Sequence, residues 1–146
     1  FKAYNDAYGY AAGDRVIKET ARCVLDAVKA VGDARADFVG HIGGDDFIVV
    51  TKPERMEALA QEIVGRFDAL APGFYKEDDR ARGRLLSKDR KGDDMEFPLL
   101  SIAVGVCHNQ LKPISSYAEV SSLGAELKKV AKRETCSAYF IARRSR

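Results

Sequence analysis

The sequence predicts an α/β fold, of the two-layer α+β kind, in which helices pack on one small β-sheet. Its 146 residues suit a single compact domain spanning 1–146. Hydrophobic residues make up 46% of the chain and charged residues 32%, which is an ordinary globular balance. Helical and strand-like apolar patterns alternate in the order helix, hairpin, helix, strand, helix, strand, and such alternation favours helices layered on a sheet.

The first helix is expected from Val16 to Val28, where apolar residues recur at helical spacing. Asp14 is placed to cap its start, and Gly32 follows its end. Two short apolar runs then flank a Gly-Gly-Asp-Asp sequence within residues 37–50. Two strands joined by a tight turn explain that pattern.

Pro53 opens a second predicted helix, which Pro72 and Gly73 end. Residues 74–94 are highly charged and are expected to form a loop or an exposed hairpin. A buried strand is predicted from Phe97 to Cys107.

A third helix is predicted from about Ser116 to Arg133, and a last short strand from Ala138 to Ala142. The expected buried face of that helix consists of Tyr117, Val120, Leu123, Leu127 and Val130. The predicted strands would form one four-stranded sheet. No strand is predicted before the first helix, although a βαβ arrangement would place one there.

Charge and composition narrow the classes of partner and compartment. The net charge of +2 gives no reason to expect nucleic acid or an anionic membrane as a partner. No apolar run approaches the roughly 20 residues that span a bilayer. The three cysteines are far apart and odd in number, which fits a reducing cytoplasm better than a disulfide framework. The chain begins with Phe1 rather than Met, so we expect a fragment of a longer protein.

The turn at Gly43, Gly44, Asp45 and Asp46 carries the most chemical information. Two glycines allow a sharp turn and a close approach of a ligand to the backbone. Two adjacent carboxylates repel each other unless a cation lies beside them, and their hard oxygens suit Mg²⁺ or Mn²⁺. The turn therefore suits a metal-bound triphosphate. The alternative is an ordinary hairpin turn with solvated acids.

Residues 1–14, FKAYNDAYGYAAGD, resemble the FKxxND…GHxxGD stretch of GGDEF-domain diguanylate cyclases. Residues 43–47 resemble the GG(D/E)EF signature of that family at the expected separation. Residues 97–106 are similar to its Phe/Ser-Ile-Gly strand, and residues 127–132 to its helix that ends in an Ala-Lys pair. The resemblance implies a nucleotidyl-cyclase sheet of the polymerase-palm type with helices packed on it.

The resemblance also implies a role for individual residues. Asn5 and Asp14 match the positions that hydrogen-bond guanine, and Lys2 matches a position near the phosphates. An amide and a carboxylate can together read the carbonyl, ring N–H and exocyclic amine of guanine, a pattern that adenine does not present. Asp14 could instead serve as the helix cap, or do both.

The signature turn would provide the catalytic centre. Asp45 matches the metal-binding acid and Asp46 the second acid, on the turn formed by Gly43 and Gly44. Lys132 matches a phosphate-binding lysine, with a solvated lysine among neighbouring cations as the alternative. The family has a further metal-binding acid on a strand just before the Phe-Lys pair, so we expect neither in a chain that begins at that pair.

The implied activity is the condensation of two GTP molecules into cyclic di-GMP and pyrophosphate. The 3′-hydroxyl of one GTP attacks the α-phosphate of the other, with Mg²⁺ or Mn²⁺ as the cofactor. The product has two-fold symmetry, so two domains would face each other in a homodimer, whether transient or lasting. Regulatory domains are expected in the parent chain.

Several positions depart from the family pattern. Asp46 stands where the family usually has Glu, and Tyr10 replaces a His. Cys136 and His41 each replace an arginine. The inhibitory product site needs an acid at Asp37 and an arginine three residues before it. Asp37 is in place, but the arginine position holds Ala34, so that site is expected to be lost.

Two other functions stay open. The departures favour a catalytically silent GTP-binding or dimerisation module that regulates an attached domain. The GGDD sequence also matches the palm domain of CRISPR-associated oligoadenylate synthases. The segment that contains Asn5 and Asp14 fits guanine-using cyclases better.

Overall fold

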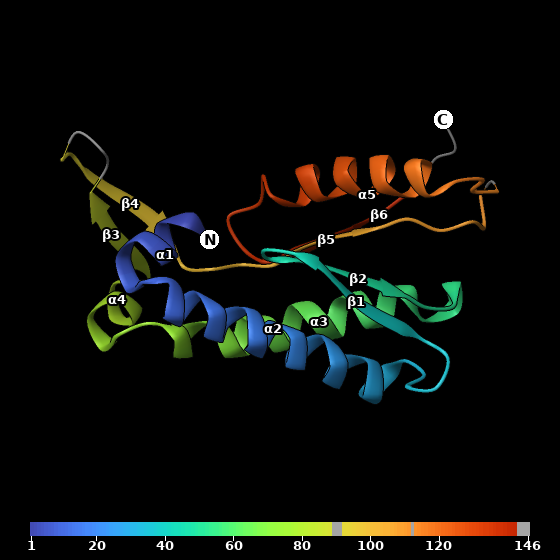
Figure 1. Ribbon diagram of the computed structural model, residues 1–146, viewed down its shortest axis with the longest axis horizontal. Coiled ribbons are helices and arrows are strands. Elements are labelled where there is room, and N and C mark those ends of the chain that lie inside the picture. Colours follow the sequence, from blue (N-terminus) through green and yellow to red (C-terminus); the bar gives the residue numbers. More distant parts are fainter. Residues whose placement is uncertain (89–91, 112, 143–146) are drawn as a thin grey trace.

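The computed structural model describes residues 1–88, 92–111 and 113–142, and its mixed helices and strands confirm the predicted fold class. Figure 1 labels the helices and strands and colours the chain from its N-terminus in blue to its C-terminus in red. The elements are α1 (Lys2–Tyr8), α2 (Tyr10–Val31), β1 (Phe38–Gly43), β2 (Asp46–Val50), a 3₁₀ helix (Pro53–Arg55), α3 (Met56–Leu70), a second 3₁₀ helix (Ala71–Phe74), α4 (Glu77–Arg82), β3 (Arg84–Lys88), β4 (Asp94–Pro98), β5 (Ala103–Val106), α5 (Tyr117–Ala131) and β6 (Ala138–Ile141).

The N-terminal helices α1 and α2 are separated by Gly9, whose φ of 86° breaks the helical path. Helix α2 therefore starts at Tyr10, earlier than the sequence pattern predicts. The cap role expected for Asp14 is wrong, because Asp14 is an exposed residue one turn inside the helix. The buried face of α2 consists of Gly13, Val16, Thr20, Cys23, Val24, Ala27 and Val28.

The predicted hairpin around the signature turn is confirmed. β1 and β2 pair antiparallel, with Val39 opposite Val49 and His41 opposite Phe47. The register shifts between His41 and Gly43, where the ladder meets the turn. Gly43 and Gly44 have φ values of 141° and 56°, which explains why glycine occupies both positions.

The charged segment after α3 contains a hairpin, as one of the two predicted alternatives had it. β3 and β4 pair antiparallel, and Leu85 is the buried residue of this pair of strands. The short helix α4 was not predicted, and Gly83 at φ 68° ends it. Figure 1 shows the hairpin projecting at one end of the molecule, away from α5.

The single strand predicted from Phe97 to Cys107 is wrong. Phe97 lies in β4, and β5 consists only of Ala103–Val106. Two backbone N–H groups between them donate to side chains: Leu100 to the Tyr75 hydroxyl at 2.8 Å, and Ile102 to Ser137 Oγ at 2.9 Å. A strand ladder has no donors left at those positions.

Helix α5 confirms the predicted third helix but ends two residues before Arg133, and the Ser116 side chain caps it by accepting a hydrogen bond from the Glu119 N–H at 3.2 Å. Its buried face was predicted correctly only in part: Val120, Leu123 and Leu127 are partly buried, whereas Tyr117 is 72% exposed and Val130 38% exposed. α5 packs on β5 and β6, which run parallel, and α3 also contacts both strands. Figure 1 shows α5 above these strands and α3 below them.

The strands form three two-stranded ladders in the described part of the chain, so the expectation of one four-stranded sheet is wrong. Side-chain packing joins two of these ladders instead. Val39 and Val49 of the β1–β2 hairpin and Val104 of β5 pack on one cluster from α2 and α3. The buried members of that cluster are Val24, Ala27, Val28, Leu59 and Ile63.

Candidate functional site

The signature turn presents its two acids to solvent at the tip of the β1–β2 hairpin. Asp45 and Asp46 are both exposed. His41 supports the turn from β1, because its Nε2 donates a hydrogen bond to the carbonyl oxygen of Gly44 at 2.9 Å. The His41 ring also stacks on Phe47, with the ring centroids 4.9 Å apart. The histidine that replaces the expected arginine therefore braces the turn.

Asp46 is joined to α5 by an ion pair. The Lys128 ammonium donates a hydrogen bond to Asp46 Oδ1, across 82 positions of sequence. This hydrogen bond holds the pKa of Asp46 below its ordinary value, and the charge of Lys132 acts in the same direction. The sequence analysis assigns Lys128 no role. Its spacing of four residues from Lys132, which places both on one helix face, could have identified it.

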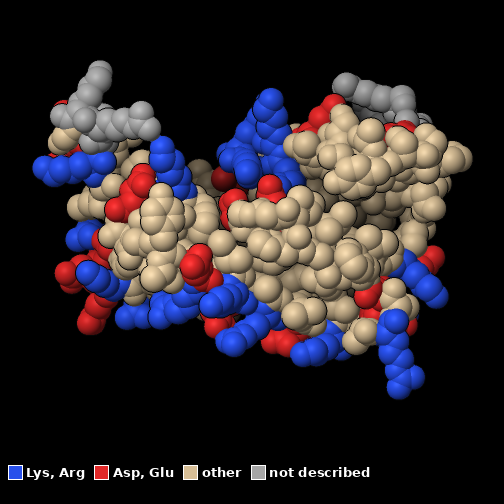
Figure 2. Space-filling model, viewed as in Figure 1, with Lys and Arg blue, Asp and Glu red and all other residues tan. Residues whose placement is uncertain are grey.

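Close packing of α5 on β5 positions these lysines. A Cβ at Gly105 would lie 2.7 Å from the Gly124 carbonyl oxygen and 3.0 Å from the Lys128 backbone nitrogen. Only glycine lets the helix lie this near the strand. Figure 2 shows Lys and Arg side chains gathered at the upper middle of the view, near the C-terminal end of α5, with acidic atoms beside them.

The predicted guanine-binding residues lie together on α1 and α2. The amide of Asn5 packs against α2 at Gly13, where a larger side chain would collide with it. Asp14 is the next residue along α2. Asn5 Oδ1 is buried and has no hydrogen-bond partner among the described residues. Such an acceptor normally finds a donor. Lys2 and Asp14 are exposed.

The structure thus forms two groups of predicted site residues. Lys2, Asn5 and Asp14 lie on α1 and α2, and the turn acids lie near α5. Within residues 1–88, 92–111 and 113–142, no hydrogen bond or ion pair joins one group to the other.

The donor set at the turn fits a magnesium ion that shares its coordination with a substrate. The described residues contain no group of three or more His, Cys, Asp or Glu side chains that could hold a metal. Mg²⁺ is usually bound by one or two carboxylates together with substrate phosphates, and keeps several waters. Asp45, with Asp46 beside it, offers such carboxylates.

Asp37, which matches the acid of the family's inhibitory product site, has a structural role. Its side chain is 2% exposed, its Oδ2 accepts a hydrogen bond from the Asp33 N–H at 2.8 Å, and its Oδ1 lies 3.9 Å from Arg55 Nη1. Cys136, which replaces an expected phosphate-binding arginine, is an exposed free thiol.

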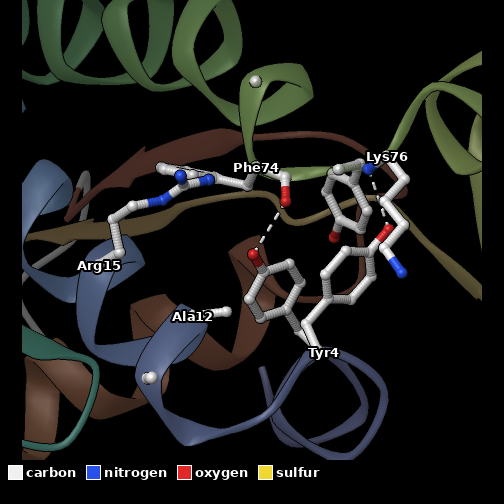
Figure 3. Close-up of a pocket in the computed structure, with 9 residues that line it drawn as sticks. Tyr4, Ala12, Arg15, Phe74 and Lys76 are labelled. Carbon is white, nitrogen blue, oxygen red and sulfur yellow. Dashed lines mark hydrogen bonds between the residues drawn. The ribbon is translucent and has the colours of Figure 1, made fainter.

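A surface cavity of about 460 Å³ lies on another side of α1. Its lining includes Tyr4, Arg15, Phe74 and Lys76, and none of the predicted site residues. Figure 3 shows the Tyr4 hydroxyl pointing across it to the Phe74 carbonyl oxygen, a hydrogen bond of 2.9 Å. This cavity marks where α1 is anchored rather than where the turn acids lie.

Comparison with known proteins gives one family and several relatives. A model of the family described as "Diguanylate cyclase, GGDEF domain" matches residues 1–81, more than half of the chain. An uncharacterised signalling protein of Caulobacter vibrioides is 36% identical over 97 residues, which cover 64% of this chain and 11% of that protein.

Two further relatives are named as diguanylate cyclases. Diguanylate cyclase A of Treponema denticola is 36% identical over 66 residues, covering 43% of this chain and 16% of that protein. Diguanylate cyclase DosC of Escherichia coli is 25% identical over 134 residues, covering 91% of this chain and 24% of that protein. The chain thus spans at most about a quarter of these three relatives.

No solved structure gives a significant match to the chain. Among the described residues, no helix combines the length and the apolar character needed to cross a bilayer.

Proposed function

Since the chain belongs to the GGDEF family of diguanylate cyclase domains, we propose that it binds GTP with Mg²⁺ or Mn²⁺ and condenses two GTP molecules into cyclic di-GMP and pyrophosphate. The observation that supports this most directly is the turn, where two glycines with positive φ present two exposed carboxylates beside the cations of α5. Carboxylates that can hold a divalent ion and lysines that can meet phosphates are the groups that phosphoryl transfer needs.

The α1–α2 group would bind the base. The buried Oδ1 of Asn5 is an acceptor without a partner in the described part of the chain, and the carboxylate of Asp14, on the residue after Gly13, offers more acceptors. The ring N–H and exocyclic amine of guanine are donors that would satisfy them, whereas adenine has an acceptor at the ring position. The Lys2 ammonium, in the first turn of α1, would meet the phosphates.

Asp45 would hold the metal ion, and Asp46 would add a second carboxylate beside it. The ion, when bound, would polarise the α-phosphate and lower the pKa of the attacking 3′-hydroxyl. The protein's own part is positioning: Gly43 and Gly44 bring the backbone close to the phosphates, and Lys132 balances their negative charge. A GTP substrate and free thiols both suit the cytoplasm.

Product formation by the full-length protein tests the proposal. Incubation with GTP and Mg²⁺ or Mn²⁺ should give cyclic di-GMP, measured by chromatography, and Asp45→Ala should abolish it. Asp68→Ala, which removes an exposed carboxylate on α3, is the matched control and should leave the rate unchanged. GTP binding without any product would instead identify a silent GTP-binding module.

Nucleotide choice tests the base site separately. GTP should bind more tightly than ATP, and Asn5→Ala should weaken GTP binding about 5- to 150-fold, which corresponds to about 1–3 kcal/mol for a lost partner in a buried polar site. Equal affinity for ATP and GTP in calorimetry would contradict the guanine assignment and favour the oligoadenylate-synthase palm.

A further inference from the structure

Lys128 is the cation that the proposed mechanism leaves without a task. It belongs to α5, and its ammonium reaches Asp46 on the signature turn. The close contact of α5 with Gly105 places the Lys128 backbone directly over β5, so the root of this side chain is fixed by packing. Lys132 lies four residues further along and acts on the same carboxylate.

The strength of this ion pair is what makes it informative. The Lys128 and Asp46 side chains are 33% and 50% exposed, and ion pairs that face water contribute little to stability. A divalent ion carries twice the charge of an ammonium group and prefers carboxylate oxygens. The ion can therefore displace Lys128 from Asp46, and the freed ammonium stays close to the turn on its anchored helix.

Charge balance indicates which group the displaced lysine would meet. Nucleotide binding brings a triphosphate to the turn, and the position where the family commonly has a phosphate-binding arginine holds the uncharged side chain of Cys136. On the proposed function above, the phosphates would then lack one cation. Lys128 is the described cation that already contacts the turn.

We propose that Lys128 is a movable counter-ion: it neutralises Asp46 in the empty site and turns to the triphosphate when a divalent metal ion takes its place. The inference rests on the proposed function, because it needs a triphosphate at the turn. Lys128 thus competes with the metal ion when the metal arrives alone and assists it when the metal arrives with a nucleotide.

Replacing Lys128 should therefore have opposite effects on two equilibria. Lys128→Met removes the competitor, so Mn²⁺ alone should bind about two- to fivefold more tightly. The same change removes a charge-assisted contact with a phosphate, so Mg²⁺ with 3′-deoxy-GTP should bind about tenfold more weakly. The 3′-deoxy nucleotide lacks the attacking hydroxyl, so binding is measured without turnover.

The full-length protein serves for both measurements, with Mn²⁺ followed by electron paramagnetic resonance and the nucleotide by calorimetry. Lys129→Met is the matched control, because it removes the same charge from an exposed neighbour on α5 and should change neither affinity. Thermal unfolding of the two variants should agree, which shows that α5 stays in place.

The outcomes separate this inference from the proposed function. Opposite shifts in Lys128→Met alone support the movable counter-ion. Wild-type binding of the nucleotide, with Lys128→Met indistinguishable from Lys129→Met, overturns it and leaves the proposed function intact. Weaker binding of both metal and nucleotide in Lys128→Met shows a merely structural lysine and overturns it too. A wild-type protein that binds no nucleotide overturns both.

Discussion

At the scale of single residues, Asp37 joins the end of α2 to the 3₁₀ helix before α3. Its carboxylate accepts a hydrogen bond from the Asp33 N–H and lies near Arg55, and a side chain at Gly32 would collide with it. An acid used in this way is not free to bind a product. The structure adds a physical reason to the sequence-based expectation that the inhibitory site is lost.

Asp37→Ala should destabilise the fold by about 1–3 kcal/mol, because it leaves the Asp33 N–H without its acceptor in a half-buried place. Urea unfolding would measure this. Asp26→Ala, which breaks an exposed ion pair with Lys29, should change stability by less than about 1 kcal/mol. A stable Asp37→Ala protein that loses submicromolar cyclic di-GMP binding would contradict the structural role.

Cys23 makes stability depend on alkaline pH. Burial raises the pKa of its thiol to about 11, from an ordinary value of 9.0. As the pH rises, the Cys23 thiol ionises in the unfolded chain before it ionises in the folded protein. Its contribution to the free energy of unfolding is therefore complete below pH 9 and is lost as the pH rises towards 11. The loss at pH 10 should be on the order of 1 kcal/mol. Denaturant unfolding at pH 8 and pH 10 should show a smaller loss in Cys23→Ala, and an equal loss would refute the assignment.

Residue patterns in the sequence predict the turn acids, Asn5 and Asp14 as site residues, because each belongs to a local motif. They did not identify the partners of Asp46 and Asp37. Lys128 is 82 positions from Asp46, and only the packing of α5 on β5 brings them together. The four-residue spacing of Lys128 and Lys132 indicates a shared helix face, but a single sequence does not show which acid that face meets.

At the scale of secondary-structure elements, α1 is anchored by aromatic side chains. Tyr4 and Tyr8 stack with ring centroids 4.8 Å apart, and Tyr75 meets both rings edge-on. Tyr4 is 1% exposed, and its hydroxyl donates to the Phe74 carbonyl oxygen. These contacts place the helix that carries Lys2 and Asn5.

Tyr4→Ala should destabilise the protein by about 3–5 kcal/mol, as large aromatic deletions in a core do. GTP binding should weaken as well, because Asn5 loses its support. Tyr4→Phe keeps the ring and should cost only about 0.5–1.5 kcal/mol, with nucleotide binding preserved. Tyr10→Ala, at a side chain 78% exposed, is the control and should be nearly neutral. Equal thermal unfolding of Tyr4→Ala and Tyr10→Ala would contradict this anchoring.

Elements with a long or distinctive pattern were predicted well from the sequence. The hairpin followed from its glycines and flanking apolar runs, and α3 and α5 from their helical periodicity. α1 and α4 have seven and six residues, too few for a periodic signal. The prediction of one long strand was wrong because the side chains of Tyr75 and Ser137 accept hydrogen bonds from backbone N–H groups within it. An apolar run in the sequence does not reveal such acceptors.

At the scale of the whole molecule, the fold class was predictable but the arrangement of the strands was not. Two ladders, β1–β2 and β5–β6, share one core with α2 and α3 instead of forming a common ladder among the described residues. The hairpin tip consequently holds its acids at the surface. An exposed tip is open to a second copy of the chain.

Such an approach is what the proposed reaction requires. Each domain would hold one GTP, and the 3′-hydroxyl of each would attack the α-phosphate of the other, so two half-sites must face each other about a two-fold axis. We predict that the rate of cyclic di-GMP formation rises with the square of protein concentration where the protein is mainly monomeric. Initial rates across a dilution series, with the mass in solution measured in parallel, would test this. A specific rate that stays constant on dilution while the mass is that of a monomer would show that one copy suffices and that the symmetric arrangement is wrong.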